Sequence, residues 1–258
     1  MKIISIANQK GGVGKTTTTM SLGAALATRG KQVLLIDLDP QGNLSSYLGY
    51  EPDDGNTIHE LIVAAANGKQ LNAASCIRRN EKENLDYIPA TLALSSADAV
   101  IQSAIGRESV LHRVLQAPVF ASYDYIFIDC LPSLGNLTLN AFGASDSVLV
   151  PVQAQKFAVD GLDALLDIVS MVKNLVNPRL YVEGILRTMQ DRTNMSKEVD
   201  ASLVEQYGDT VYNTGIGRSV EAANSTAYQK SLVSYKNKLG QDYEAFTYEF
   251  LKREEAVS

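Results

Sequence analysis

A glycine-rich stretch near the start of the chain has the residue types and the spacing of a phosphate-binding loop. Residues 9–16 read Gln-Lys-Gly-Gly-Val-Gly-Lys-Thr. Glycines let the backbone curl so that successive N–H groups point at one anion. In such a loop Lys15 can reach the β- and γ-phosphates of a nucleotide, and the hydroxyl of Thr16 can ligate Mg²⁺. The stretch therefore predicts a site for a nucleoside triphosphate with magnesium.

A second lysine in this loop is unusual. The common pattern G-x-x-x-x-G-K-[ST] has glycine where this chain has Gln9, and the chain carries Lys10 five residues before Lys15. Within one subunit Lys10 has no obvious function, because Lys15 already reaches the phosphates. The alternative is a plain glycine turn with two solvated lysines. The spacing and the flanking elements favour the phosphate loop.

The elements that would position this loop are a strand before it and a helix after it. Residues 3–7 form a short apolar, β-branched run that is typical of a buried strand. Residues 17–29 predict a helix with Leu22, Ala25 and Leu26 on one side. The N-terminus of that helix would add a partial positive charge beside the bound anion.

Two further predicted strands end in carboxylates. Residues 33–37 form an apolar run that ends in Asp37, and Asp39 follows in a polar loop. Residues 123–129 form an aromatic and β-branched run that ends in Asp129, which we expect to hold Mg²⁺ through water. Ligands bind at the carboxyl ends of parallel strands, where acidic side chains near a triphosphate are costly unless a metal or water needs them. Alternatively, the residues after Asp37 form only a polar turn.

The rest of the chain predicts alternating strands and helices. Residues 85–90, 147–153 and 181–186 are expected strands, and residues 160–175 an amphipathic helix. Such alternation implies right-handed crossovers and a mainly parallel sheet. No internal repeat or linker interrupts the chain, so we expect a single-domain α/β fold over residues 1–258.

Other helices are indicated by their ends. Thr57 and Glu60 fit a capping box for a helix that continues to about Ala66. Residues 95–117 predict one or two helices, interrupted near Gly106 and ended by Pro118, whereas the polar residues 69–84 give no clear prediction. A final helix is expected over residues 242–255, with an apolar stripe that we interpret as core packing, formed by Tyr243, Phe246, Phe250 and Leu251.

Composition limits the classes of protein. The chain has 258 residues, 45% of them hydrophobic, and no apolar run near the ~20 residues of a membrane span. The predicted first strand begins at residue 3, so no signal peptide is expected. Cys76 and Cys130 have no disulfide or metal spacing, and we expect both to be buried or half-buried in a cytoplasmic protein. His59 and His112 are interpreted as non-catalytic. The net charge of −6 argues against a protein coated in nucleic acid but allows a local basic patch.

Three motifs together resemble one family. The K-G-G-x-G-K-T form of residues 10–16 resembles the deviant Walker A motif of the ParA/MinD ATPases. Residues 34–43, LLIDLDPQGN, resemble its Walker A′ motif, and residues 129–135 resemble its D-C-P-P-S-L-G motif with Leu131 in place of one proline. The resemblance covers nearly the whole chain and is weaker after residue 200. It implies a P-loop fold with a twisted, mostly parallel sheet of about seven or eight strands and helices on both faces.

The resemblance implies ATP and Mg²⁺ as cofactors and assigns residues to them. In that family the extra lysine, here Lys10, crosses a dimer interface to the partner's nucleotide. The first aspartate of Walker A′, here Asp37, lies near Mg²⁺, and the second, here Asp39, positions the attacking water. The implied catalytic residues are Lys10, Lys15 and Asp39. The implied phosphate-binding residues are Lys10, Gly11, Gly12, Val13, Gly14, Lys15, Thr16 and Thr17, and the magnesium residues are Thr16, Asp37 and Asp129.

Two later segments resemble the family less closely. Residues 188–194 look like a shortened T-M-x-D-x-R-T-N loop, whose arginine, here Arg192, faces DNA in Soj-like members. Residues 211–219 resemble the V-F-x-T-x-I-P-R-N segment, which packs against adenine. Gly217 and Ser219 replace its proline and asparagine. We therefore expect the backbone at these two positions to contact the base, with less secure adenine selectivity.

The DNA-binding signal is mixed. Glu221 stands where the Soj type has a DNA-binding arginine, which is the wrong charge for a phosphate backbone. In contrast, residues 222–241 carry three lysines and no acidic residue, with Tyr228 and Tyr235 interleaved. Doubled across a dimer, such a patch could bind DNA without sequence preference, although it could also be a solvated face. The DNA-binding residues that we predict are Arg192, Arg218, Lys230, Lys236 and Lys238.

The implied function is an ATPase that partitions plasmid, mobile-element or chromosomal DNA. Its ATP-bound homodimer would bind non-specific DNA on the nucleoid, and a ParB-like centromere-binding protein would stimulate hydrolysis. One alternative is a MinD-like membrane-binding ATPase, but residues 250–258 are short and partly acidic for a membrane helix. A reductase like the nitrogenase iron protein would need cluster-binding cysteines, a pattern that is not met. Glu221 keeps open a third alternative, a non-enzymatic scaffold that positions other cargo.

Overall fold

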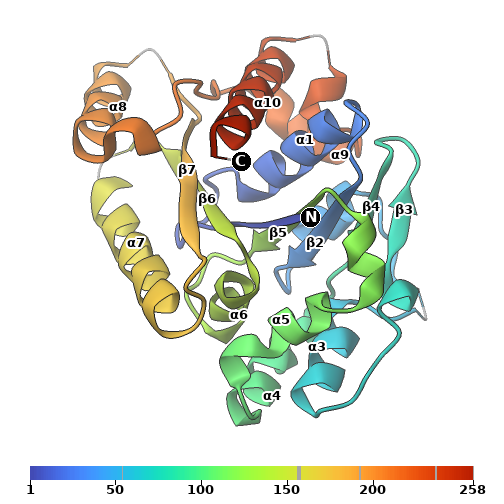
Figure 1. Cartoon of the computed structure of the whole chain (residues 1–258). Helices are drawn as coiled ribbons and strands as arrows, with labels where there is room; N and C mark the ends of the chain where they lie inside the picture. The colour runs from blue at the N-terminus through green and yellow to red at the C-terminus, as the bar shows by residue number, and fades with distance from the viewer. Residues whose placement is uncertain (54, 156–157, 192, 236, 258) are drawn as a thin grey trace.

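The strands of this chain form one mostly parallel sheet. The computed structural model describes residues 1–53, 55–155, 158–191, 193–235 and 237–257. Within that part a seven-stranded sheet has the order β3-β4-β2-β5-β1-β6-β7 (Figure 1). Only the β3–β4 pair is antiparallel. The strands are β1 (Lys2–Ile6), β2 (Val33–Leu38), β3 (Arg78–Asn80), β4 (Leu85–Ile88), β5 (Tyr125–Cys130), β6 (Ser147–Gln153) and β7 (Tyr181–Thr188). The expected single-domain α/β fold is confirmed.

Helices cover both faces of the sheet, as Figure 1 shows. On one face lie α1 (Lys15–Ala27) and α10 (Lys238–Val257), with α2 (Asn43–Tyr47) and α9 (Glu221–Ala227) beside them. The other face packs against α3 (Ile58–Ala66), α4 (Ala97–Ser103), α5 (Val110–Leu115), α6 (Asn136–Ala144) and α7 (Ala158–Leu175). The remaining helix is α8 (Asn194–Tyr207). Short 3₁₀ turns are η1 (Ala73–Cys76), η2 (Leu92–Ser96), η3 (Arg107–Ser109), η4 (Pro118–Ser122), η5 (Gly208–Thr210) and η6 (Leu232–Ser234).

The side chains of the central strands divide between two cores. In β1, Ile4 and Ile6 join the core that contains α1 and α10, whereas Ile3 joins the core on the opposite face. Successive side chains of a strand point to opposite faces, so a central strand covered on both sides must be apolar throughout. This is why the strands appear in the sequence as continuous apolar runs.

Helix α1 is buried on more sides than its apolar stripe predicted. Leu22 is fully buried as expected, but polar residues such as Thr18 are fully buried as well. The reason is that α10 packs across α1 from outside the sheet, and Tyr243 of α10 lies 3.1 Å from the Thr18 hydroxyl, oxygen to oxygen. Phe246 and Phe250 of α10 are also fully buried, which confirms that the stripe of the last helix is core packing.

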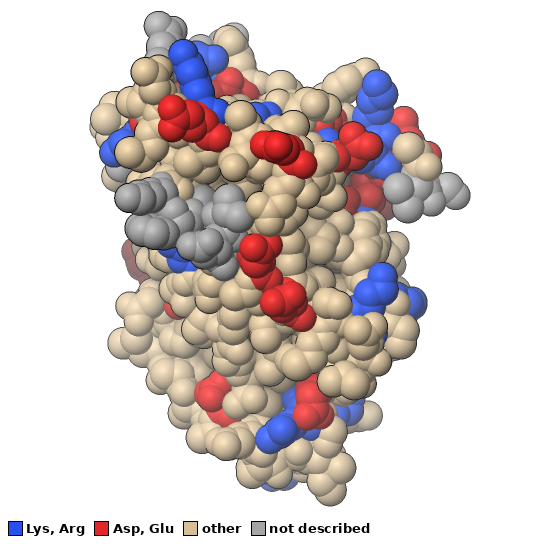
Figure 2. All heavy atoms as spheres, turned by 90° about the vertical axis from the view of Figure 1, so that its left-hand side faces the viewer, with Lys and Arg blue, Asp and Glu red and all other residues tan. Residues whose placement is uncertain are grey.

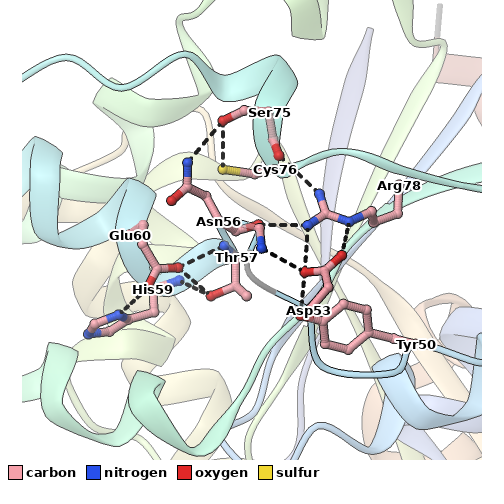
Figure 3. Close-up of polar contacts among 10 residues, drawn as sticks. Tyr50, Asp53, Asn56, Thr57, His59, Glu60, Ser75, Cys76 and Arg78 are labelled. Atoms are coloured by element: carbon pink, nitrogen blue, oxygen red, sulfur yellow. Dashed lines mark hydrogen bonds and ion pairs between the residues drawn. The ribbon is translucent and has the colours of Figure 1, made fainter.

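The predicted capping box at the start of α3 is confirmed (Figure 3). The Thr57 hydroxyl accepts a hydrogen bond from the backbone N–H of His59 at 3.2 Å, and the backbone N–H of Thr57 donates to Glu60 Oε2 at 2.7 Å. The ring of His59 contacts Glu60 and Ser96, at 2.9 and 3.0 Å. These contacts agree with a structural role for His59.

The residues without a clear prediction, 69–84, form η1 and the edge strand β3. Arg78 of β3 pairs with Asp53, with its nitrogen 3.1 Å from Oδ1, and donates to the carbonyl of Ser75 at 3.0 Å (Figure 3). The hydrogen bonds from Arg78 lower the pKa of Asp53. The loop before α3 is thereby held against the edge of the sheet by residues that lie 25 positions apart.

Both cysteines are buried, as the composition predicted. Cys130 ends β5 and Cys76 ends η1, so neither thiol lies at the surface. Within the described ranges, the length and apolarity needed to cross a bilayer are found in none of the helices.

Candidate functional site

The sheet topology brings the three sequence motifs to one edge. In the register of the central strands, Asp129 at the end of β5 lies beside Ile6 of β1 and Asp37 of β2. The loop that follows β1 leads into α1 at this same edge. Ligands of open α/β sheets bind at the carboxyl ends of the strands, near the point where the strand order reverses. The predicted phosphate loop and the predicted carboxylates therefore meet where a ligand is expected.

The backbone of the loop has the conformation that glycine provides. Gly12 and Gly14 have φ angles of 72° and 88°, in the left-handed region that other residues rarely adopt. A Cβ added to Gly12 would meet nothing within 4 Å. Conformation rather than crowding therefore requires glycine there, and the space beside the loop is open. Thr188 at the end of β7 donates to the carbonyl of Val13 at 2.8 Å and fixes the loop from the other side.

The two lysines of the loop occupy different environments. Lys15 is buried, and its ammonium donates to the carbonyl of Lys10 at 3.2 Å. Burial lowers the pKa of Lys15, although the charge of Asp129 opposes the shift. The side chain of Lys10 lies at the surface and donates to Gln155 Oε1 at 2.6 Å. The ammonium of Lys15 is thus held within the loop, whereas that of Lys10 lies at the surface beside Gln155.

Two buried carboxylates lie side by side next to the loop. The Thr16 hydroxyl donates to Asp129 Oδ2 at 2.7 Å, and Thr19 lies 3.4 Å from the other carboxylate oxygen. Burial, with a further contribution from the charge of Asp37, raises the pKa of Asp129 to about 8. Burial also raises the pKa of Asp37 to about 6. Burial away from water is the largest cause of both shifts, and a cation bound beside the two carboxylates would lower both pKa values.

The predicted magnesium residues suit a metal that arrives with a nucleotide. Thr16, Asp37 and Asp129 offer one hydroxyl and two carboxylates. In the part of the chain that the structure describes, no group of three or more His, Cys, Asp or Glu side chains could hold a metal ion. Mg²⁺ usually keeps several waters and is bound by one or two carboxylates together with phosphate oxygens. The residues present fit that arrangement.

Asp39 lies nearer to solvent than the other two carboxylates of the site, Asp37 and Asp129. It is half-buried, unlike Asp37, and its Oδ1 accepts a hydrogen bond from the backbone N–H of Gln41 at 2.9 Å. Its own N–H donates to Asp37 Oδ1 at 3.1 Å. The loop then enters α2, where the N–H and hydroxyl of Ser45 donate to Asp37 Oδ2 at 2.8 and 2.7 Å. Asp39 is thus the carboxylate of this loop that water can reach.

The two later segments of the sequence adjoin each other. Gln190 donates to the carbonyl of Ile216 and accepts from the N–H of Arg218, both at 2.9 Å. The N–H of Gly217 therefore points away from this bridge and donates to Asp242 Oδ2 of α10 at 3.0 Å. A proline at this position would have no N–H to donate. That these residues and Ser219 contact a base stays a prediction.

The predicted DNA-binding residues are only partly within the described structure. Arg192 and Lys236 lie outside the described residues. Arg218, Lys230 and Lys238 are exposed. The ammonium of Lys238 lies 3.4 Å from Asp242 Oδ1, and that of Lys230 lies 5.2 Å from the centre of the Tyr235 ring.

The surface over α7 and α8 differs in charge from the C-terminal segment that carries the predicted lysines. Figure 2 shows acidic groups separated by uncharged surface across the described part of this face, with basic groups near its margins. Exposed acidic residues of these helices include Asp163, Asp167 and Glu198. A continuous basic stripe is not seen on the visible, described part of this face. The exposed described lysines predicted from the C-terminal segment, Lys230 and Lys238, belong to neither of these helices.

Sequence reasoning missed several residues that support the site. Thr19 follows Lys15 by four positions, so helical spacing could have placed it on the same side of α1. Ser45, Thr188 and Asp242 reach the site from separate parts of the chain. No local pattern indicates Thr188 or Asp242, because their contacts depend on how separate elements pack, whereas Ser45 follows Asp37 by only eight positions.

Comparisons with known proteins agree with this geometry. A family model described as an AAA domain matches residues 1–182. The chain is 46% identical, over 236 residues, to the sporulation initiation inhibitor protein Soj of Bacillus subtilis (strain 168), and the match covers 91% of each protein.

Two solved structures share the fold and hold nucleotides. Cobyrinic acid a,c-diamide synthase from Mycobacterium smegmatis, with bound ADP and magnesium, matches with a TM-score of 0.85 and 34% identity, over 100% of this chain and 96% of that one. A putative plasmid partition protein from Borrelia burgdorferi B31, bound to AMPPNP, matches with a TM-score of 0.82 and 29% identity, over 98% of this chain and 99% of that one. With the phosphate loop, the paired carboxylates and the Soj relative in agreement, the chain belongs to the ParA/Soj-like partition ATPases of the deviant Walker A family.

Proposed function

We propose that this chain is an ATP-dependent DNA partition ATPase that uses Mg²⁺. The observation that carries the proposal is the convergence of Lys15, Thr16, Asp37 and Asp129 at the carboxyl edge of the sheet, with both carboxylates buried and their pKa values raised. The nucleotides bound by the Mycobacterium and Borrelia proteins support it. One of these proteins is a synthase and the other a putative plasmid partition protein, so what the two have in common is nucleotide binding on this fold.

Each residue of the site has a separate role in the proposed reaction. The backbone of residues 11–17 and the ammonium of Lys15 hold the phosphates. Mg²⁺, when bound, would neutralise charge on the phosphate oxygens. Asp39 would orient the attacking water, and its half-buried position beside the buried Asp37 supports this role. Gly217 and Ser219 would line the base.

Lys10 is the reason to expect a dimer. Its side chain lies at the surface against Gln155, while Lys15 already points into the loop. In an ATP-bound homodimer each Lys10 would contact the γ-phosphate of the partner's nucleotide and stabilise its charge, as an arginine finger does. Lys10→Ala should then bind ATP but neither dimerise nor hydrolyse it. A Lys10→Ala protein that stays monomeric and fully active would exclude this sandwich.

The dimer would bind DNA through the C-terminal lysines. Arg218, Lys230 and Lys238 are exposed, and non-specific DNA binding needs charges at the surface rather than base contacts. Arg192 and Lys236 are included in the proposal from the sequence alone. A ParB-like centromere-binding protein would stimulate hydrolysis, which separates the subunits and releases the DNA.

The test is binding to a random-sequence DNA duplex with ATP and Mg²⁺, with ADP, and without nucleotide, at several salt concentrations. ATP-dependent binding that weakens steeply with salt is expected. Lys230→Ala and Lys238→Ala should each reduce the salt slope by about 1. Lys69→Ala, an exposed lysine outside the C-terminal segment, is the matched control. Absence of binding in every state, with ATP binding and dimerisation demonstrated, would contradict the DNA role.

One observation favours a second candidate function. Glu221 begins α9, which leads directly to Lys230, and its carboxylate pairs with the hydroxyl of Ser219 at 3.2 Å. A negative charge here disfavours a phosphate backbone. The second candidate is therefore a cargo-positioning ATPase that uses a membrane or a protein surface in place of DNA. Flotation with anionic lipid vesicles in the presence of ATP distinguishes the membrane form of this candidate from the partition ATPase.

A further inference from the structure

The short helix α2 is attached directly to the metal-side carboxylate. It follows residues 37–42, which are the end of β2 and the loop after it, without a break, and the N–H and hydroxyl of Ser45 both donate to Asp37 Oδ2. The same hydroxyl accepts a hydrogen bond from the N–H of Ala90 at 2.8 Å. A helix of five residues is little longer than one turn, so a rearrangement of the residues before it would shift the whole helix.

Two residues further along, Tyr47 joins α2 to the C-terminal part of the chain. Tyr47 is 1% exposed, and its hydroxyl donates to Ser225 Oγ of α9 at 2.6 Å. It also lies 3.3 Å from the carbonyl oxygen of Lys230. Ser225 is fully buried, and its hydroxyl donates a hydrogen bond to the carbonyl of Ala222 at 2.8 Å. The contact is therefore a buried, directed chain of hydrogen bonds between positions 178 residues apart.

On its other side, the backbone of Lys230 is fixed to the edge of the sheet. The carboxylate of Glu83, in the turn between β3 and β4, accepts hydrogen bonds from the N–H and the hydroxyl of Ser231, at 2.8 and 2.6 Å. Glu83 is 4% exposed. We call residues 225–231 the Lys230 segment. It is held to α2 through Ser225 and the carbonyl of Lys230, and to the β3–β4 turn through Ser231.

The residue between these two attachments has an uncommon backbone conformation. Gln229 has a φ of 50°, in the left-handed region that a non-glycine residue adopts only at a cost in energy. A shift of α2 relative to the sheet edge would change the separation of the two attachments. The Lys230 segment must then rearrange at or near Gln229, because both of its ends are buried and hydrogen-bonded.

We infer that Tyr47 is a positioning residue that transmits rearrangement of the loop 37–42, on nucleotide binding, to the backbone that presents Lys230. This inference rests on the proposed binding of Mg-ATP beside Asp37. It adds the route by which the nucleotide sets the position of a DNA-contacting lysine. The proposed route depends on two side chains of this chain, the phenol of Tyr47 and the hydroxyl of Ser225.

The direct test is hydrogen–deuterium exchange of the full chain with and without a slowly hydrolysed ATP analogue and Mg²⁺. In the wild type we expect the exchange of amides in residues 37–47 and in the Lys230 segment to change on binding. In Tyr47→Phe, which keeps the ring and removes one hydroxyl, residues 37–47 should still respond. The Lys230 segment should not. Ser225→Ala removes the acceptor of the shorter bond but leaves the contact of Tyr47 with the Lys230 carbonyl, so it should weaken the response of the segment, and the double variant should match Tyr47→Phe.

Tyr212→Phe is the matched control. Tyr212 is as fully buried as Tyr47, but its hydroxyl has no hydrogen-bond partner within the described residues. In Tyr212→Phe, hydrogen–deuterium exchange of the Lys230 segment should change on nucleotide binding as it does in the wild type. A Tyr47→Phe protein whose Lys230 segment still responds would overturn the inference. So would a wild type in which the segment is unchanged although titration shows that the nucleotide has bound.

DNA binding supplies a second readout that separates this inference from the proposed function. The ratio of DNA affinity with ATP to that with ADP should fall by roughly three- to tenfold in Tyr47→Phe, the size expected for one buried hydrogen bond, with ATP affinity unchanged. If the wild type shows the exchange response but binds no DNA, the DNA role fails and the coupling stands. If the wild type binds no ATP, both fail.

Discussion

The phosphate side of the site and its C-terminal side are built in different ways. On the phosphate side, contacts join residues that are close in sequence, such as Lys15 to the carbonyl of Lys10 and the N–H of Asp39 to Asp37. On the C-terminal side, contacts join distant residues, such as Glu83 to Ser231, 148 positions apart. The difference shows that local backbone rules shape the phosphate loop itself, although Thr188 and Asp129 also reach it from far along the chain, whereas the surface beside it depends mainly on long-range packing. Four variants test this comparison.

The largest effect is expected from Asp39→Ala on the phosphate side. Turnover should fall by about 10²- to 10⁴-fold, because the water loses its positioning carboxylate. ATP affinity should change little, since Asp37 and Asp129 remain, and an ATP-bound dimer should persist. Phosphate release, ATP titration and size-exclusion chromatography measure these three properties.

Asp53→Ala is the control for this variant. Asp53 Oδ1 accepts a hydrogen bond from the N–H of Gly55 at 2.9 Å, the same local turn that Asp39 makes with Gln41. It lies in the loop before α3 rather than at the phosphate loop, so turnover should stay normal. Unchanged turnover in Asp39→Ala would remove Asp39 from the mechanism.

Lys15→Ala should have the next largest effect. Removing a buried ammonium that would face phosphate oxygens should weaken ATP by on the order of 100-fold. Isothermal titration with ATP and Mg²⁺ measures the loss. Lys31→Ala, an exposed lysine just after α1, should bind normally. Normal affinity of Lys15→Ala would remove the assignment of the phosphate loop.

On the C-terminal side, Asp242→Ala should have a smaller and more selective effect. It removes the acceptor of the Gly217 N–H, so the predicted base segment loses one hydrogen bond. ATP should weaken by roughly three- to tenfold, whereas binding of tripolyphosphate should not change. Asp242→Asn keeps an acceptor oxygen and loses only the charge that pairs with Lys238, so it should restore ATP affinity. Equal weakening of both ligands would place Asp242 on the phosphate side instead.

The smallest effect is expected far from both sides, at the cap of α3. Although burial opposes the shift, hydrogen bonds from His59 and Thr57 lower the pKa of Glu60 from 4.5 to about 2. A carboxylate with a lowered pKa stabilises the fold above its unfolded pKa, and the contribution is lost as the pH falls toward the folded value.

Glu60→Gln should therefore be less stable than the wild type near neutral pH, and the gap should narrow as the pH falls below about 4.5. Urea denaturation at several pH values measures the gap. A gap that does not depend on pH would mean that the carboxylate charge contributes nothing to the cap.

Much of the fold followed from local patterns. The capping box of Thr57 and Glu60 formed as predicted, and Gly106, with a φ of 60°, separates α4 from the turn before α5. These signals are reliable because a cap or a helix break involves residues within one turn of each other. Residues 69–84 gave no prediction because β3 forms only by pairing with β4 and through the contact of Arg78 with Asp53.

The sequence by itself determined the phosphate side of this protein. Residue types and spacing predicted Lys15, Thr16 and Asp129 as site residues. The reason is that a glycine-rich turn and the carboxyl end of an apolar strand lie at the ligand-binding edge of the sheet in such a fold. Only the tertiary structure decided which side chains fix the C-terminal side. Tyr47, Glu83 and Asp242 act on residues that the fold brings to them from far along the chain. The physical reason is that hydrogen-bond partners buried between packed elements depend on the packing of the whole chain, which no local pattern records.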